Sequence, residues 1–286
     1  MGIQQTGRYE LSKGVLFPAI GYGTWHLENG QGTVVAVAEA LDAGYRLFDC
    51  AAIYGNDFSV GKAIMNYGLK REELFITNKL WNTYRKYDDA VMACKRTLKL
   101  MRLEYLDSYL IHWPASPKIY PNWAEVNSET WRAMERLYTD GLVRAIGLSN
   151  FLPHHIEKLL QGCSIQPMLD QLEIHPGQGQ ADAVKYCREH GLVVQAWSPL
   201  GSGKVLENER LVSLAKKYGK TVAQICIRWC IQKDVVPLPR SSSPIRMREN
   251  LDVFGFELSG DDVSEIDMVP YCGGSGLDPD EIICFG

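Results

Sequence analysis

Four polar side chains stand at or just after the ends of short apolar runs. Asp49 follows Y-R-L-F, Tyr54 comes five residues later, Lys79 follows L-F-I-T-N, and His112 follows S-Y-L-I. A phenol with its usual pKa of about 10 donates a proton poorly at neutral pH, but a neighbouring ammonium favours the phenolate and eases donation. Lys79 supplies such a charge, Asp49 an anion to hold it, and neutral His112 a hydrogen bond to a substrate oxygen. The set predicts a proton-donating site beside a carbonyl.

Taken singly, each of the four residues also has a structural explanation. Tyr54 is then a loop aromatic, Lys79 a solvent-facing strand end, Asp49 a turn or capping residue and His112 a core histidine. A single residue match carries a high false-positive risk. Placement on three successive strand ends favours the joint, catalytic interpretation.

The elements that must position these residues alternate along the chain. Eight short apolar runs predict strands at 19–25, 45–49, 74–79, 108–112, 144–149, 168–174, 192–197 and 235–239. Stretches with helical spacing lie between them, among them 33–44, 88–101 and 128–141, with Gly44 and Gly141 as helix C-caps. Eight such repeats favour an α/β fold of the (β/α)8 TIM barrel type over a doubly wound sheet, which more often uses five to seven strands. The carboxyl ends of barrel strands meet at one rim, so the four side chains are expected to converge.

Three further segments complete the expected architecture. Residues 8–18, with S-K-G between two short runs, predict an N-terminal β-hairpin that plugs the barrel floor. The Pro/Gly-rich loops 114–123 and 271–280 are expected to wall a pocket. Since no linker or low-complexity segment interrupts the chain, residues 1–286 are expected to form a single domain.

Composition narrows the classes of partner. A net charge of −4, a pI near 5.9 and 46% hydrophobic residues are typical of a soluble globular protein and argue against general binding to nucleic acid or membranes. The eight cysteines include no C-x-x-C pair and no Cys/His spacing for zinc, so we expect reduced thiols, no metal and a cytoplasmic location. No secretory signal and no membrane-spanning stretch is expected. A monomer is the simplest expectation.

Seven motifs give the chain a family resemblance. They are F-D-C-A-A-I-Y-G-N (48–56), I-T-N-K-L-W (76–81), Y-L-I-H-W-P (109–114), G-L-S-N-F (147–151), Q-L-E-I-H-P (171–176), A-W-S-P-L-G (196–201) and P-R-S-S-S-P-I-R-M-R-E-N (239–250). Over about residues 8–270 the chain resembles the aldo-keto reductases. The tryptophan at position 197 makes it similar to the diketogluconate reductase-like microbial members in particular. The resemblance implies a barrel that binds extended NADPH without a Rossmann domain, and the chain contains no G-x-G-x-x-G.

The resemblance also assigns roles to the four strand-end residues. Tyr54 becomes the general acid in the reduction of aldehydes or ketones to alcohols, with Lys79 and Asp49 as its tuning pair and His112 orienting the carbonyl. Aromatic residues at family positions that line the substrate pocket are Trp25, Trp81 and Trp113. The physiological carbonyl is left unassigned.

Positions that match the family's NADPH contacts are spread over six strand ends. Contacts with the nicotinamide are implied for Ser149, Asn150, Gln171 and Trp197, and contacts near the cofactor for Gly23, Thr24, Asp49, Ser198 and Leu200. Guanidiniums and hydroxyls suit a ribose 2′-phosphate, so Arg240, Ser241, Ser242, Ser243 and Arg246 are expected to bind it, with Glu249 and Asn250 near the adenine.

Two alternatives stay open on the sequence. A non-catalytic, NADPH-binding barrel could act as a redox sensor. A phosphate-handling barrel enzyme of another class would place its phosphate after strands seven and eight, near Arg240. The latter leaves Tyr54 and Lys79 without a role.

Overall fold

A computed structural model describes residues 8–11 and 15–282 of the 286-residue chain. It begins with an antiparallel hairpin of β1 (Arg8–Leu11) and β2 (Val15–Pro18). The hairpin prediction is confirmed, although the S-K-G turn itself lies outside the described residues.

Eight parallel strands form the centre of the molecule, as predicted. They are β3 (Tyr22–Gly23), β4 (Leu47–Asp49), β5 (Phe75–Leu80), β6 (Ser108–Ile111), β7 (Ile146–Ser149), β8 (Leu169–Glu173), β9 (Val193–Trp197) and β10 (Val235–Leu238). Each pairs with the next, from β3 round to β10. The ring closes where the amides of Gly21 and Gly23 donate to the carbonyls of Pro237 (3.0 Å) and Pro239 (3.1 Å). The (β/α)8 barrel class is therefore confirmed.

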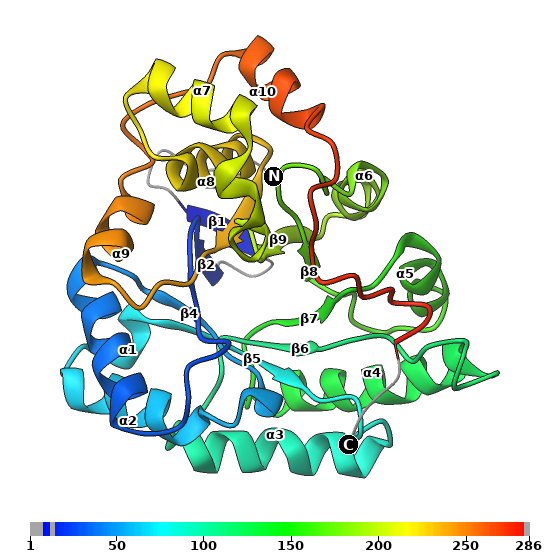
Figure 1. Ribbon diagram of the computed structural model, residues 1–286. Helices are drawn as coiled ribbons and strands as arrows, with labels where there is room; N and C mark the ends of the chain where they lie inside the picture. The colour runs from blue at the N-terminus through cyan, green and yellow to red at the C-terminus, as the bar shows by residue number, and fades with distance from the viewer. Residues whose placement is uncertain (1–7, 12–14, 283–286) are drawn as a thin grey trace.

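Helices surround the ring of strands (Figure 1). They are α1 (Gln31–Ala43), α2 (Asp57–Tyr67), α3 (Tyr87–Met101), α4 (Trp123–Thr139), α5 (Pro153–Leu160), α6 (Ala181–Glu189), α7 (Glu209–Tyr218), α8 (Val222–Gln232), α9 (Pro244–Leu251) and α10 (Gly260–Asp267). Short 3-10 turns are η2 (Ala52–Tyr54), η3 (Arg71–Glu73) and η4 (Gly201–Glu207). The helices α7 and α10 are additions to the regular repeat and pack against each other.

Helix ends follow the sequence signals in two places and depart from them in a third. Gly44 and Gly141 both adopt the left-handed conformation, with φ of 111° and 75°, after α1 and α4. The start of α4 differs from the sequence expectation, since the helix begins at Trp123 and not near 128. Its first buried positions include the polar residues Asn127 and Thr130, so the apolar periodicity that marks a helix is absent there.

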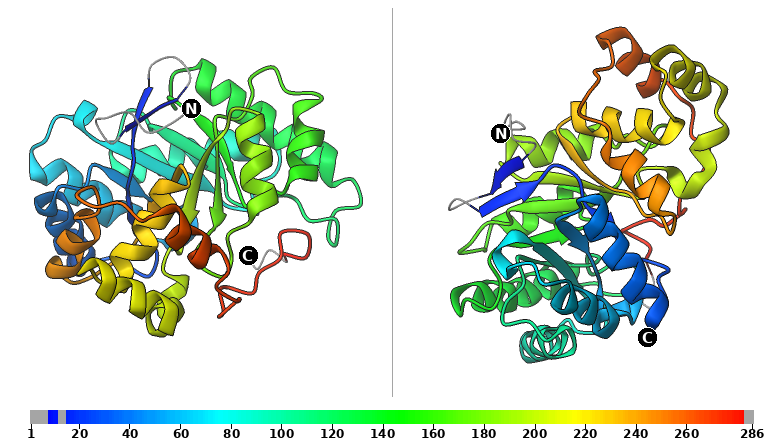
Figure 2. Two further views of the ribbon diagram at one scale, coloured as in Figure 1. Left: turned by 90° about the horizontal axis from the view of Figure 1, so that it is seen from above. Right: turned by 90° about the vertical axis from the view of Figure 1, so that its left-hand side faces the viewer.

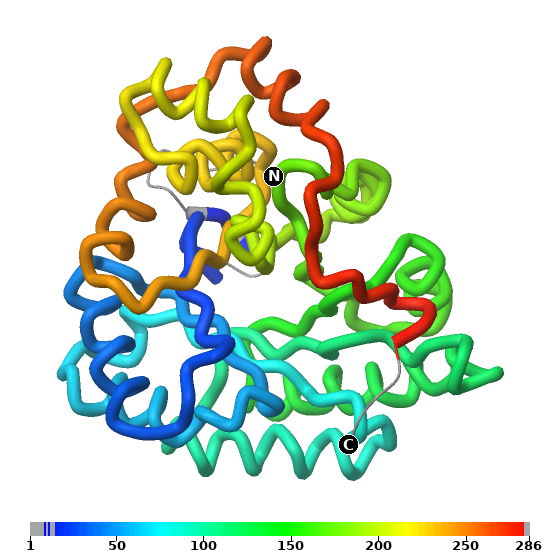
Figure 3. Tube along the Cα trace, viewed as in Figure 1, coloured from blue at the N-terminus to red at the C-terminus, as the bar shows by residue number. Residues whose placement is uncertain are grey.

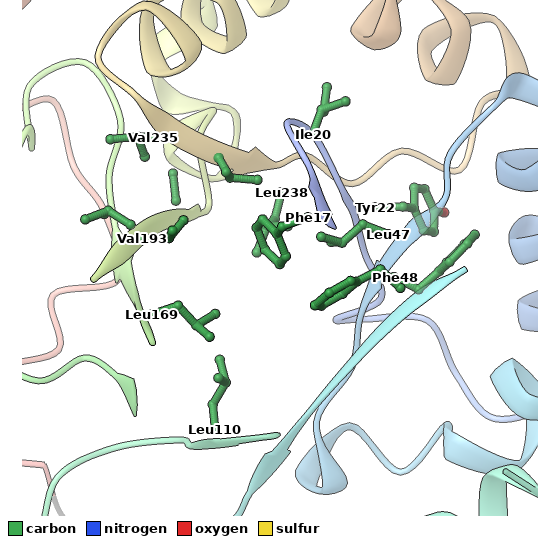
Figure 4. Close-up of a cluster of buried hydrophobic side chains, with 14 of the residues drawn as sticks. Phe17, Ile20, Tyr22, Leu47, Phe48, Leu110, Leu169, Val193, Val235 and Leu238 are labelled. Atoms are coloured by element: carbon green, nitrogen blue, oxygen red, sulfur yellow. The ribbon is translucent and has the colours of Figure 1, made fainter. Parts of the chain in front are cut away.

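Large apolar side chains fill the barrel interior (Figure 4). Phe17 of the hairpin is fully buried and packs edge-on against Phe75, the first residue of β5, with ring centroids 4.7 Å apart. The hairpin thus seals the amino end of the strands, as expected, and it lies at the end of the barrel away from the C-terminal segment (Figure 2). The floor is closed, so a ligand reaches the barrel from the opposite rim.

The ten helices in the described part of the chain include none that is both long and apolar enough to cross a membrane. The seven cysteines in that part are all free thiols.

Candidate active site

Three of the four predicted catalytic side chains contact one another directly. Lys79, whose side chain is 1% exposed, donates from Nζ to Asp49 Oδ2 at 2.7 Å and to Tyr54 OH at 3.3 Å. Its third partner is the Cys50 carbonyl, at 3.2 Å. Asp49 ends β4, Tyr54 ends the turn η2 that follows it, and Lys79 lies in the neighbouring β5. Adjacent strands therefore bring together residues that are up to 30 positions apart.

Burial and charge act in opposite directions on Tyr54 and Lys79. Burial raises the pKa of Tyr54, and although the Lys79 ammonium lowers it, the pKa settles at about 12. For Lys79, burial lowers the pKa, but Asp49 and Tyr54 more than compensate, so the pKa is raised and the ammonium is retained. The Lys79 ammonium does favour the phenolate of Tyr54, but burial raises the pKa of Tyr54 by more than the ammonium lowers it. Tyr54 consequently keeps its proton at neutral pH until a reaction takes it.

His112 lies one residue beyond β6 and faces the tyrosine. Its ring centroid is 5.9 Å from that of Tyr54 and 5.3 Å from that of Trp81. Burial, followed by the charges of Lys79 and Arg85, holds the pKa of His112 well below its usual value. The imidazole is therefore neutral, as predicted, and can donate a single N–H to an oxygen.

A hydrogen-bonded chain of amides connects this cluster to the next strand ends. Gln171 on β8 donates from Nε2 to Asp49 Oδ1 at 2.8 Å and to Gln195 Oε1 at 3.0 Å. Asn150 donates to the His112 carbonyl at 2.9 Å and accepts from Trp197 Nε1 at 2.8 Å. Both side-chain hydrogens of Gln171 are thus used within the protein, which leaves its Oε1 as the atom to receive an N–H from a ligand.

The cluster opens into a cavity of about 1270 Å³. Of the predicted site residues, its lining contains Gly23, Trp25, Asp49, Tyr54, Trp81, His112, Trp113, Ser149, Asn150, Gln171, Trp197, Ser198, Leu200, Arg240, Ser241, Ser242, Arg246, Glu249 and Asn250. The other three lie behind the wall. Lys79 is beneath Tyr54, Thr24 Oγ1 donates to the Asp49 carbonyl at 2.9 Å, and Ser243 Oγ accepts from the Arg246 amide at 3.5 Å as the cap of α9.

Arginine side chains line the cavity beyond β10. Arg240 makes only a weak contact, from Nη2 to the His26 carbonyl at 3.5 Å, and the Arg246 guanidinium forms no ion pair within the described residues. Serine hydroxyls and the N-terminus of α9 lie beside them. Two uncompensated guanidiniums next to hydroxyls and backbone amides suit a phosphate dianion. The residues present therefore fit a phosphorylated cofactor.

Aromatic side chains from several strand ends line the cavity, with Trp81 and Trp113 after β5 and β6, Trp25 after β3 and Trp197 at the end of β9. The indoles of Trp113 and Trp197 meet edge-on with centroids 6.5 Å apart, and Trp25 stacks on Tyr54 at 6.1 Å. Leu277 and Ile282 of the C-terminal segment complete this wall. The loop 114–123 was expected to line the pocket too, but the lining includes none of its residues. Instead, Ser116 Oγ donates to the Asp280 carbonyl at 2.6 Å and so supports the segment that does.

Sequence reasoning missed two buried polar residues next to the site. Gln195 is fully buried on β9 and holds Gln171, and Glu173 on β8 is buried beneath the C-terminal segment. Alternation along a strand places Gln171 and Glu173 on the same face. The spacing of two residues between Gln171 and Glu173 could therefore have indicated that Glu173 faces the same side of the strand as Gln171.

Comparisons with known proteins identify the family of the chain. A model described as the aldo/keto reductase family matches residues 19–270. Glyoxal reductase of Bacillus subtilis (strain 168) is 43% identical over 274 residues, covering 96% of each chain. The 9,11-endoperoxide prostaglandin H2 reductase of Trypanosoma cruzi (strain CL Brener) is 41% identical over 273 residues, covering 94% of each.

Solved structures share the fold over nearly the whole chain. An aldo-keto reductase enzyme from a Medee basin deep-sea metagenome library has a TM-score of 0.90 at 37% identity, covering 96% of this chain and 100% of its own. A Bombyx mori aldo-keto reductase, solved in complex with NADP, has a TM-score of 0.83 at 34% identity over 92% of each chain. With the barrel, the strand-end cluster and the matched family model in agreement, the chain belongs to the aldo/keto reductase family.

Proposed function

We propose that the protein reduces aldehydes or ketones to alcohols with NADPH and that Tyr54 is the general acid. One observation carries the proposal. The Lys79 ammonium contacts both Asp49 and Tyr54, at 2.7 and 3.3 Å, at the base of a cavity that also contains Arg240 and Arg246. A proton donor beside a charged partner, in one cavity with a phosphate-binding surface, is what a nicotinamide-dependent carbonyl reductase requires.

The cofactor's part in this chemistry is to supply a hydride, two electrons and one hydrogen, to the carbonyl carbon. Tyr54 gives its proton to the carbonyl oxygen, which completes the alcohol and leaves a phenolate. Lys79 stabilises that phenolate through its 3.3 Å contact until water reprotonates it. Neutral His112 donates to the same oxygen and fixes its position, without a competing charge.

The cofactor's contacts are proposed from the cavity lining. Arg240, Ser241, Ser242 and Arg246 would hold the 2′-phosphate, while the capping residue Ser243 positions the first turn of α9 beneath it. Glu249 and Asn250 would lie against the adenine, and Gly23, Ser198 and Leu200 along the remainder. The Trp197 indole, fixed by its bond to Asn150, would stack on the nicotinamide. Ser149, Asn150 and Gln171 would contact its carboxamide.

The remaining expectations stay proposals of the same kind. Residues 1–286 act as a single domain, as a monomer, in the cytoplasm. The aromatic wall of Trp25, Trp81 and Trp113 favours carbonyls with an apolar or flat body. Because one relative carries the name glyoxal reductase, small dicarbonyls such as methylglyoxal are suitable first substrates. The direct contacts of Lys79 with Asp49 and Tyr54 favour catalysis over a redox-sensing role.

NADPH oxidation with methylglyoxal and 4-nitrobenzaldehyde tests the proposal. Tyr54→Phe should reduce kcat by about 10²–10⁴-fold, the usual contribution of general acid catalysis, while NADPH binding persists. Tyr67→Phe makes the same chemical change on α2, at a hydroxyl bonded to Asp42, and should leave kcat unchanged. Full activity in Tyr54→Phe would refute the mechanism. NADPH binding without turnover of any carbonyl would favour the sensor.

A further inference from the structure

The C-terminal tail, residues 271–282, runs along one side of the open rim of the barrel, past β8, from α10 toward α5 (Figure 3). Polar contacts fasten it at both ends, among them the bond from Ser116 Oγ to the Asp280 carbonyl described above and three others. Ser275 contacts Glu173 on β8, the Gly274 carbonyl accepts from Lys204 Nζ at 3.2 Å, and Asp280 Oδ1 lies 2.9 Å from His154 Nε2. Residues 276–278, which line the cavity, lie between the first and last of these attachments. The cavity wall is therefore a strap held at both ends.

Two histidines beside Asp280 raise the question of a metal. His154, His155 and Asp280 bring three ligand atoms within 4.8 Å of one another. However, His155 Nδ1 accepts the Leu152 amide at 3.1 Å, which leaves the proton of the neutral imidazole on Nε2, the atom that would have to bind the ion. The group is better suited to donating hydrogen bonds to Asp280, so its role is to hold the tail.

Glu173 is the buried attachment. Glu173 is only 3% exposed. The Ser275 amide donates to Glu173 Oε1 at 2.8 Å, and the Ser275 hydroxyl donates to Glu173 Oε2 at 2.5 Å. No lysine or arginine of the described residues pairs with it, and its one neighbouring ring nitrogen, His175 Nε2, is 3.9 Å away. A buried carboxylate is costly unless hydrogen bonds satisfy it. Here the tail provides the strongest of those bonds, so the carboxylate and the tail depend on each other.

The close approach at this point confirms that the fit is specific. A Cβ added to Gly274 would lie 2.9 Å from Glu173 Oε1, 3.0 Å from Gln178 Oε1 and 3.1 Å from His175 Nε2. Only a residue without a side chain lets the tail backbone descend onto Glu173 without displacing these groups.

The Ser275 contact connects Glu173 to two segments that line the cavity, the tail and the η4 turn. Gly276, Leu277 and Asp278, which follow Ser275, line it, and so do Ser202 and Gly203 of η4, the turn that carries Lys204. Since Lys204 holds Gly274, the tail and η4 are joined next to the Glu173 contact.

We propose that Glu173 is a positioning residue for carbonyl reduction: by holding Ser275, it sets the tail and the η4 turn over the cavity. This inference rests on the proposed function. Glu173 touches no reacting atom in this scheme, so its loss should weaken binding of the carbonyl and of NADPH while the chemical step at Tyr54 continues.

The test compares Glu173→Gln with the intact chain. The amide is isosteric but loses the charge and one of the two acceptors, and hydrogen bonds to charged groups are strong enough for us to expect about a tenfold rise in KM for 4-nitrobenzaldehyde. The kcat should stay within about threefold. Glu125→Gln removes a carboxylate from the same rim, at the exposed start of α4, and should change neither constant.

A second readout is independent of turnover. Hydrogen exchange at residues 271–282 should speed up in Glu173→Gln, both with and without NADPH, because the Ser275 amide loses its ionic acceptor. Ser275→Ala should reproduce part of both effects, and in the double variant the changes should be less than additive. Should Glu173→Gln fold poorly, Ser275→Ala alone decides, since it changes an exposed position.

Three results would overturn the inference. They are a KM within twofold of the intact chain, a loss confined to kcat, or additive effects of the two substitutions. An intact chain that oxidises no NADPH would instead count against the proposed function, and the exchange measurement would then still report whether Glu173 holds the tail.

Discussion

Replacing Lys79 by methionine separates the structural from the chemical role of the buried ion pair. The ammonium is 1% exposed and has three partners, at 2.7, 3.2 and 3.3 Å. Its removal leaves the Asp49 carboxylate buried without its cation, which typically costs about 3–5 kcal/mol. Because Gln171 still donates to Asp49 Oδ1, we expect the lower part of that range. Methionine fills most of the lysine's volume, so little of the loss comes from a cavity.

Urea unfolding and thermal melting measure this effect. A loss of about 3 kcal/mol corresponds to a melting temperature about 5 °C lower, since a chain of 286 residues gains roughly 0.6 kcal/mol/K of unfolding entropy. The double variant Asp49→Asn/Lys79→Met removes both charges and should regain most of the loss, since no isolated charge is left. Reduction of methylglyoxal should fall by about 10²-fold or more in both variants, because each lacks the cation that stabilises the Tyr54 phenolate.

The reasoning fails if Lys79→Met unfolds within about 1 kcal/mol of the intact chain, a size that would make the pair no stronger than an exposed one. It fails equally if the double variant is destabilised by the sum of the single losses. Recovered activity in the double variant would show that the ammonium serves only the fold.

Two further predictions concern charge elsewhere in the molecule. Arg240→Ala should weaken NADPH about 10–100-fold and NADH by less than threefold, as measured by quenching of tryptophan fluorescence, because only NADPH carries the 2′-phosphate; equal losses would mean that Arg240 does not contact it. Asp57 is buried, and burial, partly offset by a hydrogen bond from Asn78, raises its pKa to about 6. A raised pKa means that this group's contribution to stability is complete below about pH 4 and is lost as the pH rises through 6, so Asp57→Asn should stabilise the fold by about 1–3 kcal/mol at pH 8 and by little at pH 4. A gain of equal size at both pH values in urea unfolding would contradict that account.

The barrel and the tetrad could be predicted because both leave local signals. Each strand is a short apolar run, and Asp49, Lys79 and His112 follow directly from the positions where such runs end. Parallel pairing aligns the carboxyl ends of neighbouring strands and so brings these residues close together.

Long-range contacts left no comparable signal. Glu173 and Ser275 are 102 positions apart, and the tail between Tyr271 and Ile282 has neither helical nor strand periodicity. The direction of the pKa shift of Tyr54 was harder still to predict from the sequence. Burial raises this pKa and Lys79 lowers it, and which effect is larger depends on how the site is packed. The expected lowering by Lys79 is real, but burial is the larger effect.

The closing of the strand ring between Gly21, Gly23 and the carbonyls of Pro237 and Pro239 bears on how this protein could change over evolutionary time. A ring without an edge has no strand that can slip or fray independently, so the residues on the strands, Asp49 and Lys79 among them, keep their spacing whatever happens in the loops above them. The tail and the η4 turn, in contrast, attach to the ring through a few polar contacts. Substitutions in the tail or the η4 turn can therefore reshape the cavity wall, while the residues on the strands below stay in place.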